Sequence, residues 1–436
     1  MLKVDLPFFD IPYQTDTMNA LNYNFFQTYS TLSMNQSMAL TTDIYSAMHY
    51  GLKKLNDSLD IPKQWKNVIY YGGTAVGILI FAYVLPFGYT WMEREYTRSV
   101  LSRFGVNSFN ENYNISTIRG VTGLTDNELG QFKSNAPYDF IRMNSAGSEG
   151  CILFSDLMTR KYFFYNPDDL SFVPALITVF MNLGLTVSPV THEMGIENIN
   201  DKVKEAYKND KEQIDRFIAA NSNFFVVNWV YELFRPNEPY ADRGLHPSDD
   251  GSVARYITYN QLTGDEQTYL VRQSWLGLLN FVSPLLYGYK SFPLGQNGLE
   301  GNFALRHYLT SFGTDTSIQV FLKKNPFNMV FAFHNNINYK NWFPAIEAEL
   351  VDYPLNVGEL NMLLSPRMLI GMQPENQIFK TSSPEFIGLF GLRVDFMMHK
   401  NILPYFDFTA KTKGWIAGNE YLDANASVIL GVSLRF

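Results

Sequence analysis

The chain has 436 residues, of which only 17% are charged, while 35 are Phe and 27 are Tyr. A typical soluble protein has about 25% charged residues, whereas transmembrane β-barrels combine a polar lumen with aromatic girdles. The net charge of −8 argues against nucleic-acid binding, and the one cysteine, Cys151, excludes an intramolecular disulfide framework and a cysteine-based zinc cluster.

Mean hydropathy near zero (−0.12) does not fit a bundle of apolar transmembrane helices. A large soluble β protein has a similar composition and stays an alternative. Residues 1–66 are an aromatic and Asn-rich N-terminal segment, of which residues 6–26 are expected to line a lumen or to follow a barrel wall and residues 52–66 to be helical. Residues 1–7 show no basic region followed by an apolar one, so they predict no signal peptide. An outer-membrane location therefore assumes that such a peptide has been removed.

Residues 67–300 are predicted to form a helical region with three uncharged runs, at 67–92, 170–191 and 273–289. Length alone would make the first two membrane-spanning helices. Each run is interrupted by Gly or Pro, however, and Gly73 and Gly77 have the spacing that lets two helices approach closely. We therefore expect these helices to pack against one another, against a barrel wall or inside a lumen. An inner-membrane helical protein with a β domain is the alternative.

Residues 91–98, directly after the first run, have a weak resemblance to the H-E-x-x-H helix of zinc peptidases. Glu93 and Thr97 would occupy the ligand positions and Arg94 the base position, with Glu149 as a third ligand from another helix. Thr is not a usual zinc ligand, and Arg cannot act as a base. The charged residues of this segment instead predict a solvated or interfacial helix end: Glu93, Arg94, Glu95 and Arg98.

Two further groups of residues are candidate metal ligands. His192 and its neighbour Glu193 close the second apolar run, but adjacent residues point apart on a helix, which favours a polar cap. Residues 235–265 are predicted to be a long loop, in which Arg243 could clamp a carboxylate. Four residues of this loop are candidates for binding a divalent cation, although turns explain the same residues: Asp242, His246, Asp249 and Asp250.

The remaining residues, 301–436, are predicted to form about eight antiparallel strands. Their expected spans are 303–311, 316–324, 328–339, 343–352, 359–370, 385–399, 403–416 and 424–436. Charged residues stay on one face of these segments over about ten residues, the length that a tilted strand needs to cross a bilayer. In the sixth segment, for example, Phe390, Leu392 and Val394 share a face, and Arg393 and Asp395 lie on the other. Glu347 and Glu349, on one face of the fourth, are predicted to point into a lumen.

The last strand alternates up to its final residue, with five apolar side chains on one face: Val428, Leu430, Val432, Leu434 and Phe436. A terminal strand of this kind that ends in Phe resembles the assembly signal of Gram-negative outer-membrane β-barrel proteins. The resemblance covers residues 302–436. It implies that the last strand engages the barrel assembly machinery and closes a barrel against the first strand, with lipid around it.

The sequence thus predicts a membrane α+β protein, in which transmembrane β-barrel strands carry a large helical region packed on or in the barrel. We expect an integral outer-membrane protein without enzymatic activity, acting as a structural or accessory component of a transport, secretion or assembly complex, with no cofactor. The alternatives are a passive porin and a membrane-embedded hydrolase or metallohydrolase that acts on lipid, peptidoglycan or protein, with its site among Glu93, Glu149, His192 and His246.

Overall fold

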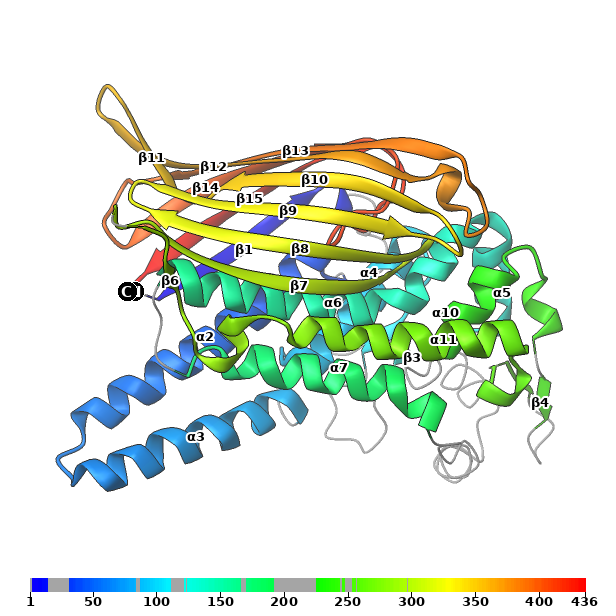
Figure 1. The fold of residues 1–436 in the computed structure, drawn as a ribbon, viewed down its shortest axis with the longest axis horizontal. Helices are drawn as coiled ribbons and strands as arrows, with labels where there is room; N and C mark the ends of the chain where they lie inside the picture. The colour runs from blue at the N-terminus through cyan, green and yellow to red at the C-terminus, as the bar shows by residue number, and fades with distance from the viewer. Residues whose placement is uncertain are drawn as a thin grey trace.

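The computed structural model describes residues 2–14, 31–83, 87–110, 121–122, 124–165, 170–191, 225–243, 245–247, 253–255, 257–295 and 297–436. The described chain has an α+β fold, in which an antiparallel sheet of eleven strands curves over a layer of helices (Figure 1). This confirms the predicted α+β class and the predicted antiparallel sheet.

The helices of the described chain are α2 (Met34–Ser58), α3 (Lys63–Tyr83), α4 (Tyr89–Arg103), α5 (Asp126–Asn135), α6 (Pro137–Tyr165), α7 (Val173–Thr191), α10 (Phe225–Phe234) and α11 (Gly264–Leu276). Short 3-10 helices are η3 (Tyr240–Asp242), η4 (Tyr259–Gln261), η5 (Gly277–Phe281), η6 (Pro284–Tyr287) and η7 (Glu375–Gln377). Residues 235–265, predicted to be a loop, contain η3, η4 and the small hairpin of β4 (Leu245–Pro247) and β5 (Val253–Arg255).

The main sheet has the strand order β1-β15-β14-β13-β12-β10-β9-β8-β7-β6, and β11 pairs beside β12. Its strands are β1 (Lys3–Ile11), β6 (Phe292–Pro293), β7 (Glu300–Thr310), β8 (Gly313–Lys324), β9 (Phe327–Ile337), β10 (Trp342–Leu350), β11 (Tyr353–Val357), β12 (Leu360–Pro374), β13 (Pro384–Phe396), β14 (Ile402–Lys411) and β15 (Asn425–Arg435). A separate two-stranded ribbon joins β2 (Phe109–Asn110) to β3 (Val121–Thr122). All eight predicted strands are present, with ends shifted by a few residues.

The two faces of the main sheet have opposite character. The convex outer face carries a field of large, exposed apolar side chains: Phe303, Ile318, Val320, Phe331, Phe333, Ile346, Met368, Ile370, Met372, Phe386, Phe390, Phe406 and Leu430. The strand registers place these side chains side by side, because Ile318 is opposite Phe333 and Phe333 is opposite Ile346. The inner face carries buried polar side chains such as Arg306, Gln319 and Glu347. This distribution is the reverse of that in a soluble sheet, where polar groups face the solvent.

The prediction of a closed barrel is wrong for the described structure, because the sheet is open between β1 and β6. The last strand, β15, does pair with the first strand, β1, over Lys3–Ile11. Beyond β1 and β7, however, the chain places helices and 3-10 turns where closing strands would have to pair (Figure 1). The physical reason lies in the side chains that cap the two edges.

Helix α2 and a turn cap the free edge of β1. The backbone N–H of Asp5 donates to Oδ2 of Asp43 on α2 at 2.8 Å, and the N–H of Asp10 donates to Oε1 of Gln14 at 2.8 Å. Pro7, between them, has no N–H to satisfy. A covered edge of this kind cannot template a further strand.

The segment that contains η5 and η6 caps the edge of β7. Asn280 acts as a substitute strand residue, because its Oδ1 accepts the N–H of His307 at 2.8 Å and its Nδ2 donates to the His307 carbonyl at 3.2 Å. The N–H of Leu305 donates to the Val282 carbonyl at 2.9 Å. At the far end of β7, the indole N–H of Trp229 donates to the Thr310 carbonyl at 2.8 Å.

Helix α6, the longest described helix, lies against the inner face of the sheet, and α2, α4 and α7 pack on its other side (Figure 1). The second apolar run forms α7, whereas the first does not form one helix, because α3 ends at Tyr83 and residues 89–92 belong to α4. The third run is helical only to Leu276, because Gly277 and Pro284 divide the rest into η5 and η6. The predicted solvated end of α4 is wrong, because Glu93, Glu95 and Arg98 are buried beneath neighbouring elements.

Replacing Asn280 with Ala tests whether the β7 edge depends on this one side chain. The N–H and carbonyl groups of His307 would be left buried without these bonds, so we expect the free energy of unfolding to fall by about 3 kcal/mol. Asn127→Ala, at an exposed position of α5, is the matched control and should change it by no more than about 0.5 kcal/mol. Denaturant titration followed by tryptophan fluorescence measures both, and equal effects would contradict the edge-capping role.

Candidate functional site

The polar interior between α6 and the sheet is the candidate functional site. Four charged residues of α6, Arg142, Glu149, Asp156 and Arg160, are spaced by seven, seven and four residues and so share one face of the helix. Asp156 Oδ1 lies 3.2 Å from Nε of Arg306 on β7, and Arg160 Nη1 lies 2.7 Å from Oε2 of Glu349 on β10. The helix therefore turns its charges toward the sheet and its apolar residues toward the other helices.

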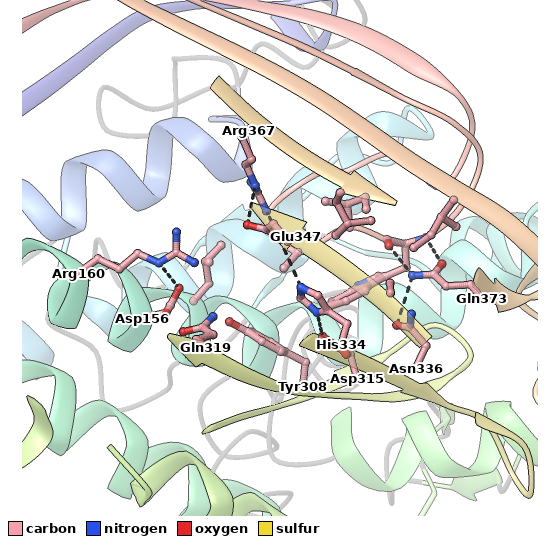
Figure 2. A pocket seen from close by; sticks show the side chains of 17 residues that line it. Asp156, Arg160, Tyr308, Asp315, Gln319, His334, Asn336, Glu347, Arg367 and Gln373 are labelled. Carbon is pink, nitrogen blue, oxygen red and sulfur yellow. Dashed lines mark hydrogen bonds and ion pairs between the residues drawn. The ribbon is translucent and has the colours of Figure 1, made fainter. Parts of the chain in front are cut away.

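A small cavity of about 40 Å³ lies in the middle of this interior (Figure 2). Strands β7 to β10, β12 and β13, helix α6 and residues 415–417 contribute its walls. At about 10–15 Å³ for each enclosed water, the cavity has room for only a few water molecules. Ligand pockets for small organic molecules have volumes of about 300–1,000 Å³. The described cavity is thus far smaller than a pocket that encloses an organic substrate.

His334 on β9 is held between two carboxylates inside this cavity (Figure 2). Its Nδ1 lies 2.9 Å from Oδ2 of Asp315, and its Nε2 lies 3.5 Å from Oε2 of Glu347. Both ring nitrogens can donate to these oxygens only when the imidazole is doubly protonated, and that form has no lone pair with which to accept a proton. Glu347 is in turn held by Arg367, whose Nε and Nη2 donate to its two oxygens at 2.9 and 3.1 Å.

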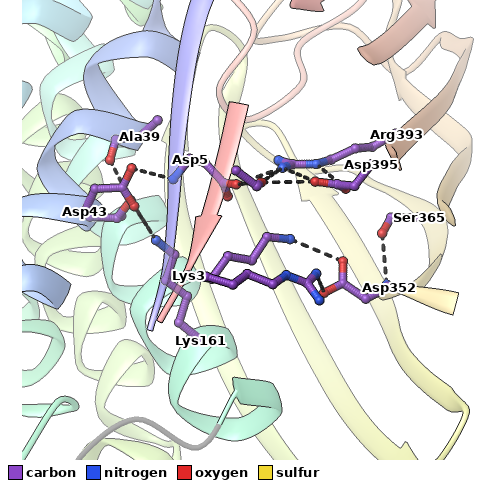
Figure 3. A network of polar contacts seen from close by, with 12 residues as sticks. Lys3, Asp5, Ala39, Asp43, Lys161, Asp352, Ser365, Arg393 and Asp395 are labelled. Carbon is purple, nitrogen blue, oxygen red and sulfur yellow. Dashed lines mark hydrogen bonds and ion pairs between the residues drawn. The ribbon is translucent and has the colours of Figure 1, made fainter. Parts of the chain in front are cut away.

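A second polar network joins β1 to the strands beside it and to α2 and α6 (Figure 3). Arg393 is its centre, with Nη2 at 2.7 Å from Asp5 Oδ1 and at 2.9 Å from Asp395 Oδ1. Its guanidinium also stacks 3.9 Å from the ring centre of Tyr405. Lys161 on α6 donates to Asp43 at 2.8 Å, and Asp43 also accepts the N–H of Asp5. The same residues therefore fix the inner face of β1 and its free edge.

The connection between β14 and β15, residues 412–424, folds toward the interior and is hydrogen-bonded to Glu149 of α6. The carboxylate of Glu149 accepts from the Trp415 indole at 2.9 Å, from the Gly418 N–H at 2.7 Å and from Arg142 Nη2 at 2.9 Å. Gly418 has a φ of +78°, and a Cβ at this position would lie 2.9 Å from the Leu153 side chain. The close approach to α6 therefore requires glycine there.

Glu420 ties the same connection to the start of α2, where it accepts the backbone N–H of Met34. The side chain is buried. Burial, with the nearby charge of Asp10 adding to it, raises the pKa of Glu420 to about 8. Residues 412–424 are thus anchored at two points, to the middle of α6 and to the first turn of α2.

The residues predicted for a hydrolase or metal site do not form one site in the described chain. Glu93 is paired with Arg94 at 3.0 Å, while Glu149 has the separate partners given above. His192, Asp249 and Asp250 lie outside the described residues, as does the side chain of His246. Asp242 is exposed in η3, and its neighbour Arg243 pairs with the buried carboxylate of Glu232. The described residues contain no group of three His, Cys, Asp or Glu side chains placed to hold a metal ion.

Four residues of the predicted barrel signal lie on β15, and Phe436 directly follows it. Val428, Val432 and Leu434 are half-buried and Leu430 and Phe436 are exposed, while Ser433 on the opposite face is buried. Sequence reasoning missed the charged face of α6. Its signal was the spacing of the charged residues from Arg142 to Arg160, which places them on one helical face. Comparison of the chain with family models, characterised proteins and solved structures found no match.

Chemically, this arrangement joins charged groups from distant parts of the chain in pairs and so holds α6 in place. The cavity is small, His334 is hydrogen-bonded to Asp315 and lies within ion-pair distance of Glu347, and Glu149 and Glu347 are each bound by arginine. Charged side chains that are paired in this way are suited to fixing the position of α6 against the sheet. An interior occupied by α6 and by residues 412–424 is also not an open aqueous channel within the described structure.

The pair of Arg142 and Glu149 gives a test of this structural role. Glu149→Gln keeps one acceptor oxygen, for either Trp415 or Gly418, and leaves the buried guanidinium of Arg142 without its counter-charge, so we expect a loss of about 3–5 kcal/mol of unfolding free energy. The double variant Arg142→Met/Glu149→Gln removes both charges and should recover most of that loss. Denaturant titration measures the difference. Equal stability of the single variant and the wild type would show that the ion pair between Glu149 and Arg142 does not stabilise the fold.

Proposed function

We propose that the protein is an integral outer-membrane protein whose sheet contacts lipid through its outer face. In this proposal it has no catalytic role and acts as a structural or accessory component of an outer-membrane transport, secretion or assembly complex. The observation that carries the proposal is the inverted sheet, with charged groups inside and large apolar side chains outside. Phe333, for example, is 64% exposed in the middle of β9, while His334 beside it faces the interior.

The size of the apolar face supports contact with lipid. The largest apolar patch of a typical soluble monomer covers about 300–600 Å² and is often functional. Here exposed Phe, Ile, Met, Leu and Val side chains extend over strands β7 to β15. The terminal strand with Phe436 supports an outer-membrane location through its resemblance to barrel assembly signals. The filled interior supports an accessory role more than diffusion through an open pore.

The capped sheet edges fit the same environment. Lipid offers no hydrogen bonds, so an unpaired backbone N–H or carbonyl inside a bilayer costs several kcal/mol. In this protein Asp43 and Asn280 satisfy edge groups that water would satisfy around a soluble sheet. The open sheet is compatible with lipid because side chains complete the bonding that a closing strand would supply.

Arginine substitutions at two depths of β9 test the proposal. In phospholipid vesicles, Phe333→Arg near the middle of the strand should lower the free energy of unfolding by about 2–4 kcal/mol, and Phe327→Arg at its first residue by only about 0–1 kcal/mol. Both phenylalanines are exposed, at 64% and 50%, so in water neither change should exceed about 0.5 kcal/mol. Reversible denaturant unfolding in vesicles measures both.

A neutral effect of Phe333→Arg, or equal effects at the two depths, would contradict contact between lipid and the sheet. Solubilising the native membranes in mild detergent tests the second half of the proposal. A component of a complex should migrate on a native gel well above the 50.1 kDa of the chain. Migration as a single monomer, with no co-purifying protein, would remove the accessory role and leave the membrane location standing.

A further inference from the structure

The helical side of the molecule, opposite the sheet, has the same inverted distribution of side chains. In α7 the polar residues Thr178, Asn182 and Thr186 are spaced by four and are all buried. Phe180, which is 66% exposed, points the other way. A surface helix of a soluble protein turns its polar stripe outward and its apolar stripe toward the core. Helix α7 does the reverse.

The two neighbouring helical segments repeat this inversion. In α3, Thr74 is buried and Gly73 and Gly77 face Leu52 and Met48 of α2, so the G-x-x-x-G spacing serves the contact inside the hairpin. The outward side of α3 carries exposed apolar residues: Val68, Ile69, Val76, Leu79 and Ile80. In residues 273–282, from the end of α11 through η5, polar residues are buried (Gln273, Ser274, Asn280) and apolar residues are exposed (Trp275, Leu278, Val282).

We propose that this helical side, formed by α3, α7 and η5, is a second lipid-contacting surface. It lies around the opening of the sheet and completes the apolar exterior that strands β7 to β15 begin. The proposal rests on the membrane location proposed above and names lipid acyl chains as the partner of the helices. The structure thereby assigns different environments to the predicted helices, with α6 inside and α3 and α7 against lipid.

The lengths of the helices agree with this assignment. Helices of 21 and 19 residues extend about 32 and 29 Å, close to the roughly 30 Å of a hydrocarbon core. Residues 173–190 of α7 form the one described segment long and apolar enough to cross a membrane, and only 33% of this segment is buried. The core helix of a soluble protein with such a composition would be mostly buried.

The start of α3 carries the residues that membrane proteins place at the lipid–water interface. Lys63, Trp65 and Lys66 lie there, at the end of the hairpin that projects farthest from the sheet (Figure 1). Lys54 lies on the facing part of α2. Trp is enriched at headgroup depth, and lysine side chains reach from apolar surroundings to the phosphates. We infer that the hairpin tip lies at the headgroups and that Val76, Leu79 and Ile80 lie deeper.

Nitroxide labels on single cysteines test this arrangement. The labels are placed one at a time at Val76, Leu79, Phe180 and Leu278 in a Cys151→Ala background, since Cys151 is buried and free. Phe333 on the sheet is the lipid reference, and Asn127, an exposed polar position of α5, is the aqueous reference. The full chain is reconstituted in phosphatidylethanolamine–phosphatidylglycerol vesicles, and circular dichroism checks the fold of each variant. Spin relaxation then compares access of oxygen, which concentrates in lipid, with access of a water-soluble nickel chelate.

The labels on α3, α7 and η5 should match the label at position 333, with nickel access at least fivefold lower than at position 127. If position 333 is in lipid while either α3 or α7 has the aqueous profile, the inference is wrong and the proposed membrane location stands. An aqueous profile at position 333 as well would overturn both. Labels at two positions of α3 ensure that a single perturbed variant does not decide the result.

Discussion

Ion pairs between α6 and the inner face of the sheet are the interactions on which the rest of the structure depends. Asp156 pairs with Arg306 and Arg160 pairs with Glu349, across 150 and 189 residues of chain. Removing one member of a buried pair costs several kcal/mol, so the charges on α6 and on the strands require each other. Side chains alternate along a strand, and a shift of one residue would turn every inward charge outward. The pairs thus fix which face of the sheet is apolar and exposed.

The same logic explains why the sheet can remain open. A closed barrel satisfies its edges by pairing the first and last strands, whereas here Asp43 bonds the edge of β1 and Asn280 bonds the edge of β7. Helices lie at the opening between β1 and β6, and α3 and α7 also turn polar side chains toward the interior. An open sheet and a helical wall together reproduce the two features that lipid demands of a barrel, satisfied backbone groups and an apolar exterior.

The sequence predicted the strands well and the interior poorly, for physical reasons. Alternation with a period of two is local, so segments such as the one containing Arg393 and Asp395 were recognised without knowledge of their partners. Strand β1 was missed because Pro7 and a bulge before Phe9 interrupt the alternation. The charges of α4 were expected in solvent, because nothing in their spacing indicates the elements that cover them. The two carboxylates beside His334 lie on the neighbouring strands β8 and β10, and they meet the imidazole only in the register of these pairs, which the spacing alone does not specify.

Extraction of cell membranes with alkaline carbonate tests most directly whether the outer face of the sheet contacts lipid. This treatment removes proteins that are bound by charge and leaves proteins that are held by contact with lipid. The full-length protein should remain in the washed outer-membrane pellet and should enter solution only with detergent. Release into the supernatant as a monodisperse particle without detergent would show that water, or another protein layer, covers the apolar face of the sheet, and would contradict the account.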